Sequence, residues 1–170
     1  NRSGSNLVRG VASALAAQTD ILGRPAADIG VIESDEAAFP EIVRQVQPSI
    51  VVLNNLFRDQ LDRYGELDTI SKSWQASFQH LPSSTRVVVN LDDPTLAAIT
   101  ESMPAVRVGF GLDDPNPSLM LDSLPHAADA KVCRDCGRDL VYDRLYSAHL
   151  GAWRCPGCGW RKARSASGVA

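Results

Sequence analysis

An unbroken apolar run, Ile50-Val51-Val52-Leu53, most constrains the fold of this chain. Such a run suits a strand that is buried on both faces, as in a parallel sheet covered by helices. Three further apolar runs, at residues 29–32, 86–89 and 106–110, are expected to be strands as well. Segments with helical spacing alternate with these runs, which is typical of βαβ units with right-handed crossovers. The sequence therefore predicts an α/β fold with a mostly parallel sheet in three layers.

Four helices are expected around these strands. Ser3 or Ser5 can cap the first helix, because a hydroxyl there can accept a hydrogen bond from a free N–H of the first turn. Pro40 and Pro94 fit the first turns of two further helices, where proline is tolerated. The expected helices span residues 7–15, 40–46, 67–78 and 94–101.

Carboxylate and amide groups directly follow three of the predicted strands. The carboxyl ends of parallel strands lie at one edge of a sheet, where open α/β folds bind ligands, so these groups are expected to lie together. Oxygen donors of this kind suit Mg²⁺ bound with phosphate. A solvated loop that caps the next helix is the alternative for each stretch. The groups are Glu33, Asp35 and Glu36, then Asn54, Asp59, Gln60 and Asp62, then Asn90, Asp92 and Asp93.

Composition and missing motifs restrict the possible functions. The chain has 170 residues, of which 44% are hydrophobic and 22% charged, as in a soluble globular protein. No apolar run approaches the roughly 18 residues of a membrane span, and no signal peptide opens the chain, so we expect a cytoplasmic protein. The sequence contains no G-x-x-x-x-G-K-[S/T] loop, whose backbone and lysine normally hold the phosphates of a nucleotide.

All four cysteines fall in two matched motifs, Cys133-Arg-Asp-Cys136 and Cys155-Pro-Gly-Cys158. Each C-x-x-C turn can present two sulfurs to one ion, and zinc prefers four thiolates in a tetrahedron. This spacing is typical of a zinc ribbon. Two disulfides or a redox pair are the alternatives. Four cysteines leave no open position for water, so the zinc is expected to be structural rather than catalytic.

The segment between the two cysteine pairs is expected to form a small hairpin. Residues 140–142 and 145–146 are the predicted strands. His149 is assigned a structural role, because the cysteines already fill the metal coordination. Trp153 and Trp160 are expected to pack over the metal core rather than to stack on nucleic-acid bases.

This segment also differs from the rest of the chain in charge. Eight Lys or Arg residues and three Asp residues lie between Lys131 and Arg164, whereas the whole chain has a formal net charge of −3. Four thiolates on Zn²⁺ would add about −2 there, which weakens a nucleic-acid interpretation. We therefore predict an α/β domain at residues 1–127 that ends in a loop or linker at 111–127. A zinc-ribbon insertion at 128–163 and a loose tail at 164–170 are expected to follow.

The chain resembles a known family over nearly all 170 residues, through the cysteines and four motifs at residues 1–7, 33–40, 56–68 and 89–94. With these motifs the chain resembles the MurT family, the Mur-ligase-like subunits of lipid II isoglutaminyl synthase. The resemblance implies the central domain of an ATP-dependent amide-forming ligase of peptidoglycan synthesis. The D-glutamate α-carboxyl of the lipid II stem peptide would be activated as an acyl phosphate, and ammonia from a GatD-type glutaminase would give D-isoglutamine.

The resemblance also implies roles for particular residues, with ATP, Mg²⁺ and a structural zinc as cofactors. Glu33 matches a magnesium ligand of the Mur ligases, and Asn6 matches an asparagine near the phosphates. Gln60 departs from the pattern, because those ligases commonly have a metal-binding histidine there. The residues expected to support the site from behind the ligands are Asp59, Asp62 and Arg63.

Two features of the family, its phosphate loop and its C-terminal ligase domain, are not found in these residues. We therefore expect a central-domain fragment that is inactive alone. Its expected partners are a GatD-type glutaminase, lipid II and ATP at the inner face of the bacterial membrane, without nucleic acid. One alternative is a non-catalytic α/β scaffold whose ribbon binds nucleic acid or a protein partner. Another is a degenerate Mur-like domain kept for assembly.

Overall fold

The computed structural model describes residues 6–57, 66–113, 121, 123, 129–164 and 167–169. The chain divides into two compact units, Asn1–Gln47 and Pro48–Ala170, and each is described by itself. The domain boundary expected after residue 127 falls on residues outside these ranges and stays a prediction. None of the described helices is long and apolar enough to cross a membrane.

The first unit contains two helices, α1 (Val8–Ala16) and α2 (Phe39–Val46). The expected helical segments are thereby confirmed, and Pro40 lies in the first turn of α2, as predicted. The helices pack through a small core of Val11, Ala38 and Ile42. Helix α2 ends where Gln47 takes a left-handed conformation with φ 48°, and the Gln47 N–H donates to the Val43 carbonyl.

Two predictions for this unit are wrong. Residues 29–32 form a loop rather than a strand, and the side chains of Ile29 and Val31 are 81% and 95% exposed. A strand needs a neighbour for its backbone N–H and C=O groups, and none runs beside this segment among the described residues of the unit. The expected serine cap is also wrong, because Leu7 occupies the N-cap position of α1 and makes no side-chain cap bond.

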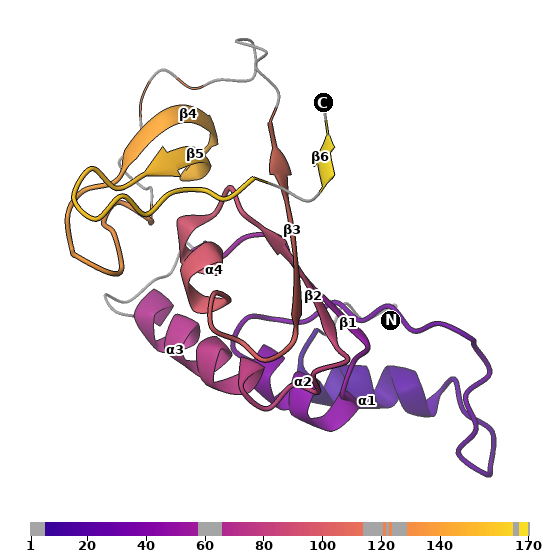
Figure 1. Ribbon diagram of the computed structural model, residues 1–170. Helices are drawn as coiled ribbons and strands as arrows, with labels where there is room; N and C mark the ends of the chain where they lie inside the picture. The colour runs from indigo at the N-terminus through magenta and orange to yellow at the C-terminus, as the bar shows by residue number, and fades with distance from the viewer. Residues whose placement is uncertain are drawn as a thin grey trace. The chain divides into compact units, whose positions relative to one another are not determined.

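The second unit is built on a parallel sheet with the strand order β1-β2-β3-β6 (Figure 1). Its main strands are in register at their carboxyl ends, where Leu53 lies opposite Val89 and Val89 opposite Gly109. The parallel α/β architecture predicted from the sequence is therefore present. The strands are β1 (Ile50–Leu53), β2 (Arg86–Asn90), β3 (Val106–Leu112) and β6 (Ser167–Val169).

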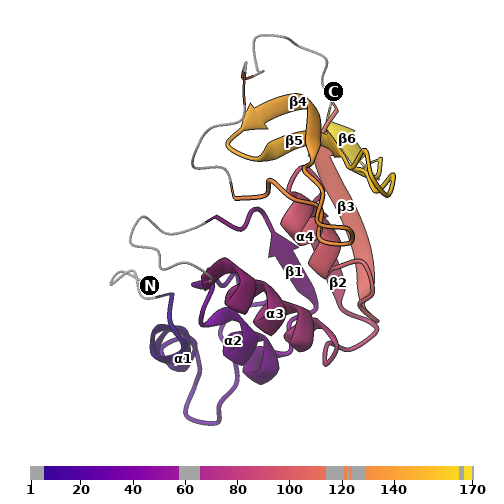
Figure 2. The same ribbon diagram turned by 90° about the vertical axis from the view of Figure 1, so that its left-hand side faces the viewer.

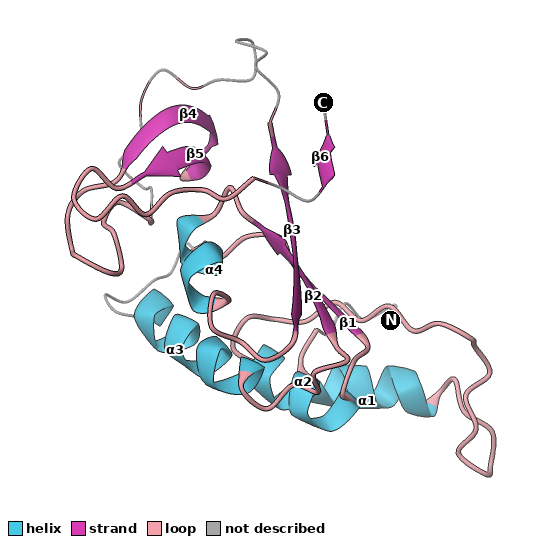
Figure 3. Ribbon diagram, in the orientation of Figure 1, coloured by secondary structure: helices cyan, strands magenta, loops and turns pink. Residues whose placement is uncertain are grey.

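Helices α3 (Glu66–Phe78) and α4 (Pro94–Ile99) cover one face of this sheet (Figures 1 and 3). Phe78, Val87 and Leu96 are completely buried between the helices and the sheet. Right-handed crossovers through successive neighbouring strands place both helices on the same side. The expected helices at 67–78 and 94–101 are confirmed, although α4 ends two residues earlier.

The three-layer arrangement and the fully buried β1 strand are not found in this unit. Ile50, Val52 and Val106 are 59%, 58% and 49% exposed, so alternate side chains of β1 lie open on the second face. No helix covers that face within the described residues of the unit. The reason is topological, since α3 and α4 both return along the first face. The unit has two layers.

A four-cysteine segment, here called the ribbon (residues 129–162), follows β3. Its hairpin consists of β4 (Val141–Ser147) and β5 (Leu150–Arg154), and lies near the carboxyl ends of the sheet strands (Figures 1 and 2). The two strands expected at 140–142 and 145–146 are instead one continuous strand. The chain turns only at Ala148, whose φ is 47°.

The tail and the linker also differ from the prediction. Residues 111–112 belong to β3 rather than to a linker. The tail contains β6, which pairs with β3 through Phe110 opposite Ser167. A short stretch of small residues gives a weak strand signal, and here the exposed edge of β3 supplies the backbone groups that the tail needs.

Candidate functional site

Each cysteine pair lies in a tight turn of the same construction. The N–H of Gly137 donates to the carbonyl of Cys133 (2.9 Å), and the N–H of Gly159 donates to that of Cys155 (3.1 Å). Both glycines have positive φ, 72° and 80°, which side chains with a Cβ rarely adopt. The two motifs therefore fold into equivalent turns, as their matched sequences predicted.

The four sulfurs meet at one point between these turns. All four lie within 4.8 Å of one another, with 3.6 Å between the sulfurs of Cys133 and Cys158 and 3.4 Å between those of Cys136 and Cys155. Four sulfurs at about 2.3 Å from a zinc ion in a tetrahedron are roughly 3.8 Å apart, so the cluster fits that metal. All four cysteines are free, which contradicts the disulfide alternative.

Backbone N–H groups favour the thiolate form of Cys155, whereas burial raises the pKa of Cys133. The N–H of Cys158 donates to the sulfur of Cys155 and lowers the pKa of that thiol to about 6, with a further contribution from the N–H of Gly157 at 3.4 Å. Backbone donors to the sulfur are a usual second layer around thiolate–metal sites. The residues present can therefore hold a metal ion of the zinc type.

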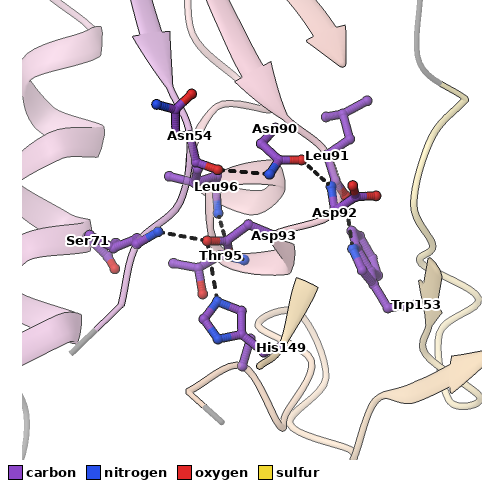
Figure 4. A network of polar contacts seen from close by, with 12 residues as sticks. Asn54, Ser71, Asn90, Leu91, Asp92, Asp93, Thr95, Leu96, His149 and Trp153 are labelled. Atoms are coloured by element: carbon purple, nitrogen blue, oxygen red, sulfur yellow. Dashed lines mark hydrogen bonds and ion pairs between the residues drawn. The ribbon is translucent and has the colours of Figure 1, made fainter. Parts of the chain in front are cut away.

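The ribbon is bonded to the segment that follows β2 (Figure 4). The indole N–H of Trp153 donates to the carbonyl of Leu91 (3.0 Å), and the N–H of Gly151 donates to the carbonyl of Asp92 (3.0 Å). Trp153 is 2% exposed, and its ring lies 4.3 Å from that of Trp160. The two tryptophan rings pack against each other, whereas their packing over the metal core stays a prediction. The buried Trp153 is not free to stack on bases.

Asp93 is the most heavily bonded carboxylate of the sheet edge, and it is completely buried. Its Oδ1 caps α4 by accepting the N–H groups of Thr95 (2.8 Å) and Leu96 (3.2 Å), and its Oδ2 accepts the N–H of Leu56 (2.9 Å). Nε2 of His149 lies 3.4 Å from the same Oδ2 (Figure 4). Asp93 therefore joins the segment after β1, helix α4 and the ribbon.

Asp92 is equally buried and serves the other side of the segment. Its Oδ2 accepts the N–H of Leu112 (2.8 Å), and its Oδ1 forms an ion pair with Nζ of Lys162 at 2.6 Å. Burial raises the pKa of Asp92, although Lys162 and the Leu112 N–H act in the opposite direction. A Cβ on Gly111 would come within 2.9 Å of Oδ1, so glycine is needed there for this close approach.

These contacts correct the sequence prediction for the β2 end. Asn90 is also engaged, since its amide donates to the carbonyl of Asn54 (2.8 Å) and its Oδ1 accepts the N–H of Asp92 (3.0 Å). Asp92 and Asp93 were expected among magnesium ligands at one sheet edge, but their oxygens are occupied by the protein itself. The sequence Asp-Pro at the start of a helix was the available signal, because aspartate is a preferred N-cap and proline follows it readily.

His149 contacts the sheet edge rather than the cysteines. It is completely buried at the tip of the hairpin, and its ring packs edge-on against Phe57 at 4.7 Å between centroids. Its structural role was predicted from the sequence, but its partners were not, because they lie far away along the chain.

The remaining magnesium and ATP candidates are divided between the two units. In the first, the N–H of Asp35 donates to the carbonyl of Asn6 (3.1 Å), which brings Asn6 beside the exposed turn that carries Glu33. Asp35 itself caps that turn through the N–H of Ala37 (3.0 Å). In the second unit Asn54 is exposed, and its carbonyl accepts the Asn90 amide. The candidates that lie outside the described residues are Asp59, Gln60, Asp62 and Arg63.

Comparison with known proteins identifies the family. The model of the Mur ligase middle domain matches residues 12–134. The chain belongs to this family. It is 34% identical over 163 residues to the MurT subunit of lipid II isoglutaminyl synthase (glutamine-hydrolyzing) from Streptococcus pneumoniae, covering 95% of this chain. The corresponding subunit from Staphylococcus aureus strain COL is 28% identical over 97% of the chain.

These relatives confirm the resemblance to the MurT family seen in the sequence. The chain spans 35% of the length of each of these two relatives. A UDP-N-acetylmuramate–L-alanine ligase of Aquifex aeolicus is 31% identical over 47% of this chain and 17% of its own length. The fold also resembles a pseudomurein peptide ligase type C from Methanothermus fervidus, with a TM-score of 0.56, 21% identity and coverage of 75% of this chain and 24% of the other.

Proposed function

We propose that this chain is the central region of the ATP-dependent subunit of a lipid II isoglutaminyl synthase. The observation that carries this proposal is the 34% identity to the MurT subunit over 95% of the chain. The reaction would activate the D-glutamate α-carboxyl of lipid II as an acyl phosphate. Ammonia from a GatD-type glutaminase would then displace the phosphate to form D-isoglutamine. The reaction would take place in the cytoplasm, at the membrane that contains lipid II.

In this proposal the exposed turn beside Asn6 serves the nucleotide. Glu33 would offer its carboxylate to Mg²⁺, and Asn6 would lie near the phosphates, with Gln60 as a further ligand and Asp59, Asp62 and Arg63 as supporting residues. Bound Mg²⁺ neutralises charge on the phosphoryl group that is transferred. Glu33 fits the task because it is exposed and no other described residue uses its carboxylate.

The cysteine cluster would hold a structural zinc. The ion leaves no position for a substrate, so its effect is to join the two turns and support the hairpin. The hairpin in turn contacts Leu91, Asp92 and Asp93, which follow β2. The proposed part of the ribbon in the enzyme is therefore to brace the edge of the sheet.

The test is substitution of Glu33 in the full-length subunit assembled with its glutaminase. Glu33→Gln should lower ATP- and glutamine-dependent amidation of lipid II by about 100-fold, as found when a group that stabilises transition-state charge is lost. Asp28→Asn is the matched control, because Asp28 is another exposed carboxylate of the same unit. Equal activity of Glu33→Gln and the control would reject the role of Glu33.

A further inference from the structure

A cavity of about 240 Å³ lies between the end of β3 and the ribbon. Leu112 and Asp113 contribute one side, and both strands of the hairpin together with residues 161–164 contribute the rest. We call it the ribbon pocket. Its volume is below the roughly 300–1,000 Å³ of pockets for drug-sized ligands, so it suits a small group rather than a whole nucleotide.

The lining of the ribbon pocket is strongly cationic. Five of the eight basic residues between Lys131 and Arg164 line it, against two acidic residues, Asp113 and Asp143. The fold thus places around one cavity most of the basic residues that the sequence spreads over residues 131–164. The five are Arg144, Arg154, Arg161, Lys162 and Arg164.

Two of these cations are already neutralised by the protein. Nε of Arg154 donates to both carboxylate oxygens of Asp143, at 3.1 and 3.0 Å. Lys162 is bonded to Asp92 (2.6 Å), to Asp113 (3.1 Å) and to the carbonyl of Leu112 (2.8 Å). Because Asp113 and Asp143 are already paired with Lys162 and Arg154, these two carboxylates do not neutralise the other basic residues of the lining.

Three arginines remain among the lining residues, Arg144, Arg161 and Arg164. Among the described residues none of the three forms an ion pair with a carboxylate. Arg161 makes one long bond, 3.4 Å, to the carbonyl of Gly159. Planar guanidinium groups bind phosphate oxygens in pairs, and several around one cavity suit a group that carries close to two negative charges.

We infer that the ribbon pocket binds a phosphate group. The phosphate could come from a dissolved anion or from the headgroup of an anionic phospholipid, and both present the same oxygens to the arginines. The inference uses only residues of the second unit and does not rest on the proposed ligase activity.

The first arm of the test uses dissolved diphosphate with the full-length, zinc-loaded protein in buffer without Mg²⁺. Calorimetry should detect binding that weakens at least tenfold in the double variant Arg144→Gln/Arg161→Gln. The matched control is Arg9→Gln/Arg24→Gln, which removes the same charge from exposed positions of the first unit and should change binding less than twofold. Glu33→Gln should also bind as the wild type does, so this site and the ligase proposal can fail separately.

The second arm uses sedimentation with vesicles of phosphatidylcholine, with or without phosphatidylglycerol. If binding requires phosphatidylglycerol and is lost in Arg144→Gln/Arg161→Gln, the pocket binds the phosphate of a lipid headgroup. If diphosphate binds and this binding is lost in the same variant, the pocket binds a dissolved phosphate anion. The inference is overturned if neither probe binds, if both double variants lose binding equally, or if succinate competes as well as diphosphate. Tighter binding of an oligonucleotide than of either probe also overturns it. Unchanged thermal unfolding of the variants confirms that they fold.

Discussion

Two acidic turns of this protein have similar sequences and opposite surroundings. Asp92 and Asp93, after β2, are 3% and 0% exposed and bind N–H groups from three parts of the second unit. Glu33, in the first unit, lies exposed beside Asn6. The sequence predicted the same role, magnesium binding, for both turns. The difference teaches that a carboxylate is available to a ligand only where the backbone has not already used its oxygens.

Metal loss should have the largest effect on the buried turn. In Cys133→Ser/Cys158→Ser, two of the four zinc ligands are lost, and structural zinc contributes of order 10 kcal/mol to small metal-dependent folds. The ribbon should unfold and release Leu91 and Asp92, with a large fall in Tm. Elemental analysis should give one zinc per wild-type chain and none per variant chain. The exposed Ser147→Ala is the control, and a zinc-free wild type of equal Tm would contradict the assignment.

Asp93→Ala should have the next largest effect. It removes the cap of α4 and leaves the buried N–H of Leu56 without its acceptor. A lost cap costs about 1 kcal/mol and a buried unsatisfied donor about 2 kcal/mol, so the free energy of unfolding should fall by about 3 kcal/mol. Urea unfolding measures this, with Asp28→Ala as the exposed control. A loss below about 1 kcal/mol would mean that water replaces the carboxylate.

Lys162→Met should destabilise the protein by about 2 kcal/mol at neutral pH, because Asp92 would stay buried without its cation. Burial already raises the pKa of Asp92 in the folded state, and removal of Lys162 raises it further. A group with a raised folded pKa favours the folded state once it is protonated, so the deficit of the variant should shrink as pH falls through that pKa. Urea unfolding at pH 7 and pH 5 tests the sign. A deficit that grows toward pH 5 would contradict it.

Glu33→Gln should have the smallest effect on stability, within about 0.5 kcal/mol, as for most exposed surface substitutions. A much smaller loss in the free energy of unfolding than in Asp93→Ala would show that the Glu33 turn, unlike the Asp93 turn, does not stabilise the fold. Urea unfolding of the variants side by side measures it. A stability loss similar to that of Asp93→Ala would show that Glu33 is structural too.

Local signals in the sequence predicted most of the elements. The Ile50–Leu53 run, Pro40 and Pro94 each act over a few residues and gave the right strand or helix boundary. The two C-x-x-C motifs predicted the cluster, because the turn that brings two sulfurs together is encoded within each motif.

The predictions that failed depend on partners far along the chain. Residues 29–32 have the composition of a strand, yet composition does not supply a neighbouring strand. The left-handed Ala148 carried no turn signal, so the continuous β4 was missed. The bond of Trp153 to Leu91 joins residues 62 positions apart, and no local pattern reports such a pairing. The burial of Asp92 and Asp93 follows from that long-range docking.

The pairing of the tail with β3 has a consequence for the order of folding. The whole ribbon lies between Phe110 and its partner Ser167, so β6 can join the sheet only after a long loop has closed. A metal that ties Cys133 to Cys158 shortens this loop, which lowers the entropic cost of closure by about 0.5 kcal/mol. We therefore expect the ribbon to fold before β6 pairs with β3.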